Sequence, residues 1–181
     1  MSKLANATNL IELCNDHVRQ LDDIDSFIAT LAPGDYALGQ SAAEPIGRHI
    51  RHVLEHYDSL LNAREGLVDY ENRARDSATE TDPDVARERI GDIRAALLAL
   101  PADAVPASLA IRYTPGDGEV ARALDTSLER ELHFVLSHTV HHMALVALLA
   151  RREGYQVAPD FGVAASTQRY YANTREDAAS A

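Results

Sequence analysis

Residues 128–153, LERELHFVLSHTVHHMALVALLARRE, decide the fold class of this chain. Apolar side chains recur there at steps of three and four, which is the period of one face of an α-helix. Thr126 and Glu129 fit a capping box at the start of this helix, and Gly154 follows its end. We therefore expect a long helix with one face turned into the protein interior. The positions on that face are Leu128, Leu132, Val135, His138, His142, Leu145 and Leu149.

Three further amphipathic helices are predicted upstream. They cover residues 5–31, the segment from Pro45 to just before Gly66, and the segment from Asp82 to Pro101. A polar loop is expected at residues 69–81. Residues 108–113 and 119–124 flank a turn rich in Gly and predict a β-hairpin. The sequence thus predicts an all-α fold, a four-helix bundle with a short hairpin between its third and fourth helices.

Composition limits the function classes. The chain has 181 residues, of which 46% are hydrophobic, so we expect one domain over residues 1–181 with a real core. Its 17 basic and 28 acidic residues leave a net charge of −11, which argues against nucleic acid and against anionic membrane surfaces as partners. Residues 155–172 are expected to be irregular, and residues 173–181 to form a disordered tail.

Location is predicted from what the sequence lacks and from its single thiol. There is no signal peptide and no run of about 18 apolar residues that would span a membrane. The only cysteine, Cys14, cannot form an internal disulfide and lies among apolar neighbours, so we interpret it as a core residue. These observations favour a cytoplasmic protein.

The histidines carry the predicted chemistry. Seven of the eight fall in two clusters, at positions 49, 52 and 56 and at positions 133, 138, 141 and 142, while His17 stands alone. His138 and His142 lie one helical turn apart, so both imidazoles can reach one divalent ion. On the second helix, His49, His52 and His56 flank one edge of the apolar face. Any of them could complete a three-histidine site, and helical rotation slightly favours His49 or His56.

Less specific interpretations stand beside this one. Glu131, seven residues before His138, could be a fourth ligand or an outer carboxylate, although a capping or ion-pair role is favoured. Arginines 48, 51 and 64 are first expected in ion pairs or solvent, and only second as a clamp for a substrate carboxylate. The histidines could also be hydrogen-bonded residues that bind no metal. No phosphate-binding Gly-rich loop or nucleophile elbow is present in the sequence.

Two segments resemble the DinB superfamily. Residues 44–53, EPIGRHIRHV, are similar to the family's second-helix motif, in which an Ile-Gly step precedes a metal-binding histidine, and residues 137–142, SHTVHH, to the His-x3-His of its last core helix. The resemblance covers residues 10–170. It implies an up-down-down-up four-helix bundle with a divalent metal held by His52, His138 and His142. The family name does not imply DNA binding, and the negative charge agrees with the absence of a DNA role.

Relatives with this fold include metal-dependent transferases and isomerases that use low-molecular-weight thiols. The resemblance therefore favours an enzyme of the thiol S-transferase kind that acts on a small-molecule substrate, with Zn, Ni or Fe as the ion and a thiol as cofactor. The alternative is a non-catalytic metal-binding or scaffold bundle, including one with a role in stress, whose site serves stability. Relatives also suggest a homodimer. The sequence identifies neither the metal nor the substrate.

Overall fold

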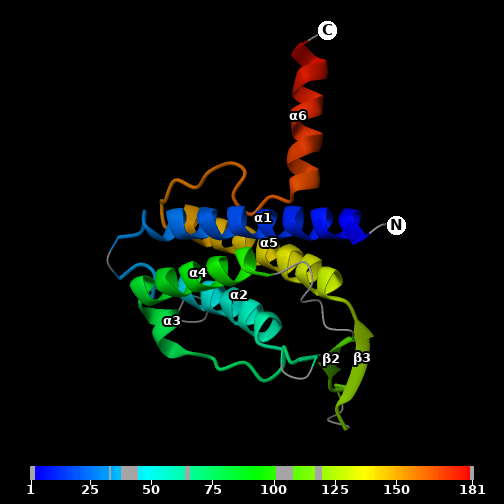
Figure 1. Ribbon diagram of the computed structural model, residues 1–181. Coiled ribbons are helices and arrows are strands. Elements are labelled where there is room, and N and C mark those ends of the chain that lie inside the picture. Colours follow the sequence, from blue (N-terminus) through cyan, green and yellow to red (C-terminus); the bar gives the residue numbers. More distant parts are fainter. Residues whose placement is uncertain are drawn as a thin grey trace.

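A computed structural model of the protein describes residues 3–32, 34–37, 45–63, 66–100, 108–116 and 120–179. Four long helices form the predicted bundle. They are α1 (Lys3–Ile28), α2 (Ile46–Leu61), α4 (Pro83–Leu98) and α5 (Leu128–Arg152). In Figure 1, α1 and α5 run in one direction and α2 and α4 in the other, which is the expected up-down-down-up order. Helices α1 and α2 each pack against both α4 and α5, so each helix of the bundle has two neighbours.

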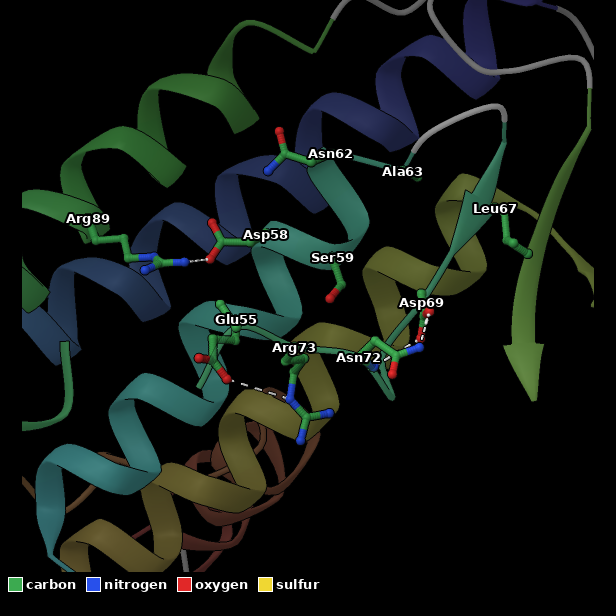
Figure 2. A pocket seen from close by; sticks show the side chains of 11 residues that line it. Glu55, Asp58, Ser59, Asn62, Ala63, Leu67, Asp69, Asn72, Arg73 and Arg89 are labelled. Atoms are coloured by element: carbon green, nitrogen blue, oxygen red, sulfur yellow. Dashed lines mark hydrogen bonds and ion pairs between the residues drawn. The ribbon is translucent and has the colours of Figure 1, made fainter. Parts of the chain in front are cut away.

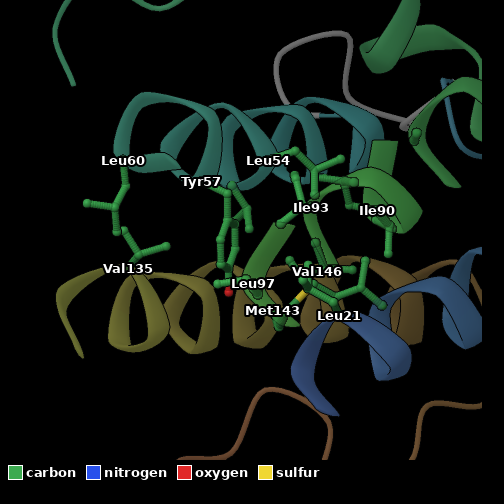
Figure 3. Packing of buried hydrophobic residues seen from close by; sticks show 14 of the residues in the cluster. Leu21, Leu54, Tyr57, Leu60, Ile90, Ile93, Leu97, Val135, Met143 and Val146 are labelled. Atoms are coloured by element: carbon green, nitrogen blue, oxygen red, sulfur yellow. The ribbon is translucent and has the colours of Figure 1, made fainter. Parts of the chain in front are cut away.

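The core lies between these four helices. Figure 3 shows α2 and α5 facing one another, with Leu54 and Tyr57 of α2 above Met143 of α5. Leu21 enters from α1 and Ile90 from α4, and these five side chains are almost completely buried. Each such apolar side chain stabilises the fold by about 1.5–3 kcal/mol relative to exposure. Helical periodicity correctly predicts the burial of Leu21, Tyr57 and Ile90. On α5 the prediction is wrong after Val135: the expected positions there, His138, His142, Leu145 and Leu149, are only half-buried, and the buried positions are Thr139, Met143, Val146 and Ala150.

Side-chain caps fix two of the helix starts. The Asp82 carboxylate caps α4 by accepting hydrogen bonds from the backbone N–H groups of Asp84 and Val85, and Pro83 opens the helix, as expected. For α5 the predicted capping box is wrong. Ser127 is the N-cap and accepts from the Arg130 N–H at 3.2 Å, whereas the Thr126 hydroxyl donates to Glu131. The helix therefore begins one residue later than a Thr126 cap would place it.

The predicted hairpin is present. Strands β2 (Leu109–Tyr113) and β3 (Arg122–Thr126) pair antiparallel, with Ile111 opposite Leu124. Residues 117–119 of the predicted turn and strand lie outside the described residues. A third strand, β1 (Leu67–Val68), pairs parallel with β2 and was not predicted. Two residues show no periodicity, so only the pairing with β2 makes this segment a strand.

Two short segments correct the sequence interpretation. Helix α3 (Ser77–Thr81) lies within the predicted loop, and its N-cap Asp76 accepts from the N–H groups of Ala78 and Thr79. Residues 155–164 are irregular, as expected, but helix α6 (Ala165–Ala179) replaces the rest of the expected irregular segment and most of the expected disordered tail, and it projects away from the bundle in Figure 1. Good helix formers such as Ala, Gln and Arg occupy α6 without an apolar stripe, so a search for amphipathic periodicity misses it. Residues 180–181 lie outside the described residues.

Helix α5 is long and apolar enough to cross a membrane by length and composition, but the core helix of a soluble protein passes the same test. Here α5 packs against α1 and α2 within the bundle. Its buried apolar residues, among them Leu132, Val135 and Met143, belong to the protein core, whereas Leu148 is exposed. The cytoplasmic location remains a prediction.

Candidate metal centre

Three histidines converge between α2 and α5. His52 of α2 meets His138 and His142 of α5, and one ring nitrogen from each lies within 4.8 Å of the others. The Nε2 atoms of His52 and His138 are 2.9 Å apart. Two nitrogens that bind one ion at about 2.0–2.1 Å are separated by about 2.9–3.4 Å in octahedral or tetrahedral geometry. The cluster therefore fits a divalent metal, although its spacing does not identify which one.

The three rings have the protonation state that a metal ligand needs. Burial, followed by the neighbouring imidazoles, lowers the pKa of His52 and of His142 to about 3, and burial also lowers the pKa of His138. All three are therefore neutral at pH 7, with one unprotonated nitrogen each. Between His52 and His138, one Nε2–H donates to the other Nε2. A metal ion would replace that hydrogen after a shift of tautomer.

The other two histidines of α2 contact this cluster from outside. His49 is buried, and its Nδ1 lies 3.0 Å from Nδ1 of His142. His56 is also buried, and its Nδ1–H donates to the backbone carbonyl of His52 at 2.7 Å. Helical rotation slightly favoured His49 or His56 as the third histidine of the site, and both are more buried than His52, but His52 is the one that converges with the α5 pair. The ligand role of the three remains a prediction.

The buried carboxylate of Glu131 binds Tyr70, whose ring lies next to His56. Glu131 is fully buried and accepts hydrogen bonds from the Thr126 hydroxyl at 2.6 Å, the Tyr70 hydroxyl at 3.0 Å and the Arg130 guanidinium at 2.9 Å. The Tyr70 ring in turn stacks on His56, with 5.3 Å between centroids. Glu131 is not among the grouped ligands of the described residues. This geometry supports the hydrogen-bonded role over that of a fourth ligand.

A glycine sets the position of the histidine-bearing helix. A Cβ added to Gly47 would lie 2.1 Å from the backbone oxygen of Glu80 and 2.6 Å from the Tyr36 ring. The Gly47 N–H donates to the Tyr36 carbonyl at 2.9 Å, and the Tyr36 hydroxyl donates to the Thr79 carbonyl at 2.7 Å. The glycine of the EPIGRHIRHV motif therefore lets the start of α2 pack directly against the end of α3.

The arginines of α2 are ion-paired, as first expected. Arg51 contacts Glu55 at 3.0 Å and Glu80 at 2.9 Å, and Arg48 contacts Glu80 at 3.2 Å. Glu55 is buried and also accepts from the backbone N–H of Asp76 at 2.9 Å. Arg64 lies outside the described residues. These pairs attach α2 to the α3 segment.

Cys14, the single cysteine, and His17, the histidine outside the two clusters, both lie on α1 in the core. Cys14 is buried, and burial raises the pKa of its thiol, which agrees with a core role. His17 is also fully buried, with its Nδ1 2.8 Å from the Tyr57 hydroxyl. Thr139 of α5 contacts the same hydroxyl at 3.4 Å. His17 therefore belongs to a polar contact that joins α1, α2 and α5 beneath the cluster.

A large cavity of about 1030 Å³ lies on the outer side of α2 (Figure 2). Its charged side chains are paired, Arg89 with Asp58 and Arg73 with Glu55. Neighbouring Tyr70 stacks on His56 beside the histidine cluster, whereas Arg73 lines the cavity. The segment that holds Tyr70 and Arg73 therefore contacts both His56 and the cavity. The sequence did not predict this cavity, because it forms where the polar faces of α2 and α4 meet residues 67–74, and the path of that segment depends on tertiary packing.

Fold and site together define a class of protein. It is a four-helix bundle in which three histidines from the second and the last bundle helix converge at a position that fits a divalent ion. The chain belongs to the DinB superfamily, whose model matches residues 9–146. No curated protein and no solved structure matches the chain. The superfamily assignment thus confirms the resemblance found in the two histidine motifs.

Proposed function

We propose that this protein is a divalent-metal-dependent enzyme that transfers a group from a small electrophilic molecule to a low-molecular-weight thiol. The observation that carries the proposal is the open character of the histidine group. Only three ligands converge among the described residues, and each of the three rings is half-buried. Structural zinc sites have four protein ligands and are closed, whereas catalytic sites keep a position for water or substrate.

The chemistry of the proposed reaction is simple to balance. A bound Zn, Ni or Fe ion would supply Lewis acidity that lowers the pKa of a thiol bound beside it. The thiol proton passes to solvent, and the sulfur forms a bond to the electrophilic carbon. The leaving group departs with the electrons of its former bond. His52, His138 and His142 would hold the ion. The Phe134 ring stacks on His138, and the Tyr70 ring packs against Phe134.

The same proposal covers partners and location. It includes a small-molecule substrate, a cytoplasmic setting and a homodimer, and it includes no nucleic acid and no membrane. The net charge of −11 supports the exclusion of polyanionic partners. The alternative function is a non-catalytic metal-binding bundle in which the ion serves only stability.

Metal content is the first test. Native mass spectrometry and elemental analysis of untagged protein should give about one divalent ion per chain, and His138→Ala should lose it. His133→Ala is the matched control, because His133 is an exposed histidine on the same helix. Absence of metal from the wild type after reconstitution with Zn, Ni and Fe would overturn the proposal.

Thiol binding separates the enzyme from the structural alternative. Calorimetry with low-molecular-weight thiols on the metal-loaded protein should show binding that His138→Ala abolishes. A loaded protein that binds no thiol, but melts far lower after chelation, would support the non-catalytic alternative.

A further inference from the structure

His49 lies outside the group of three converging histidines but contacts one of them, His142. Their Nδ1 atoms are 3.0 Å apart, and their ring planes are tilted by 45°. At this separation one nitrogen carries a hydrogen and the other accepts it. The neutral imidazole of His142 has only one ring hydrogen, so this contact is tied to the state of its other nitrogen, Nε2.

Two arrangements of the hydrogen are possible, and only one suits a metal. If His49 donates, His142 is protonated at Nε2 and accepts through Nδ1, which leaves no nitrogen to bind an ion. If His142 donates through Nδ1, its Nε2 keeps a free lone pair that can bind an ion. Metal-binding histidines almost always donate their other ring N–H to a neighbouring acceptor, which fixes the tautomer and the ring orientation.

We propose that His49 is a positioning residue that accepts a hydrogen bond from Nδ1–H of His142 and so holds His142 in the tautomer that binds the ion through Nε2. This inference rests on the proposed metal site and deepens it. His49 is suited to the role because it is buried on α2, one turn before His52. One helix thus supplies both a ligand and the residue that orients a ligand of the facing helix.

Substitutions at position 49 separate the acceptor from the bulk of the side chain. Asn places its amide oxygen at the position of the histidine Nδ1, so His49→Asn keeps the acceptor. His49→Leu keeps a side chain of comparable size and removes the acceptor. We expect His49→Leu to weaken metal binding about 10- to 100-fold and His49→Asn to restore most of the loss. Competition titration against a chromophoric chelator measures these affinities.

A tautomer measurement tests the inference without metal or activity. Long-range ¹H–¹⁵N spectra of metal-free protein at pH 7.5 should show His142 protonated at Nδ1, with a shift toward the Nε2–H tautomer in His49→Leu. The far-UV circular dichroism spectra of both variants should first match that of the wild type, which shows that they fold. If His49→Leu misfolds, the tautomer of His142 in the wild type and in His49→Asn still tests the inference. A wild-type His142 protonated at Nε2 would overturn the inference.

The metal-bound state distinguishes positioning from direct ligation. With Co²⁺ as a spectroscopic probe, the visible absorption of His49→Asn should match that of the wild type, because the ligand set is unchanged. A changed coordination spectrum in His49→Asn would mean that His49 is itself a ligand, which contradicts the inference. Failure of the wild type to bind any ion, with the tautomer as expected, would refute the proposed function alone.

Discussion

Replacement of Gly47 by Ala tests how α2 is positioned. The added Cβ would stand 2.1 Å from the Glu80 backbone oxygen and 2.6 Å from the Tyr36 ring, and real Cβ contacts below 3.0 Å are essentially never seen. The start of α2 must therefore move by about 1 Å against packed backbone, which is overpacking that costs about 1–3 kcal/mol. Weakening of the hydrogen bond from the Tyr36 hydroxyl to Thr79 adds about 1 kcal/mol.

A second helical glycine provides the matched control. Gly91 lies within α4, and a Cβ added there meets nothing within 4 Å. Gly91→Ala should therefore raise the free energy of unfolding by about 0.5–1 kcal/mol through helix propensity alone. Gly47→Ala should lower it by about 2 kcal/mol or more, so the same chemical change has opposite signs at the two sites.

Urea denaturation followed by circular dichroism at pH 7.5 measures both changes. The m-values of both variants should stay at that of the wild type. The reasoning is refuted if Gly47→Ala is as stable as the wild type, since the start of α2 would then not pack against α3 as described. A destabilised Gly91→Ala would instead show that the reference value for a helical glycine fails in this bundle.

Three further predictions concern buried polar groups. Burial lowers the pKa of His17 to about 4, below its ordinary 6.5, so the unfolded chain binds the proton first and stability falls as the pH decreases through this window. In urea titrations, the free energy of unfolding of the wild type should therefore fall by about 2 kcal/mol more than that of His17→Gln when the pH changes from 7.5 to 5. An equal fall in both proteins would contradict the low pKa of His17. Glu55→Ala removes the buried carboxylate that pairs with Arg51 and Arg73, although Arg51 keeps its pair with Glu80, and should cost about 3 kcal/mol in the same assay; a cost below 1 kcal/mol would show the network to be dispensable. Cys14 should react with a thiol-specific chromogenic reagent much more slowly in the native than in the urea-unfolded protein, because it is buried and its pKa is raised. Equal rates would place this thiol at the surface.

The four bundle helices follow from local sequence. Their apolar positions recur with the helical period, and caps such as Asp82 act on neighbours two and three residues away, so no tertiary information is needed to place them. Helices α3 and α6 escape this reasoning, because α3 is only five residues long and α6 has no apolar stripe. The strand β1 exists only through its pairing with β2.

The candidate metal centre likewise has one part that follows from local sequence and one part that depends on helix packing. The spacing of His138 and His142 on one helix determines that their rings lie one turn apart, because helical geometry is local. Which histidine of α2 meets them depends on how α2 is rotated and tilted against α5, and the packing of Gly47 against Glu80 helps to set that arrangement. Rotation about one helix axis favoured His49 or His56 and could not identify His52. The convergence of nitrogens from two helices at one point is a property of their packing, and therefore only the tertiary structure decided it.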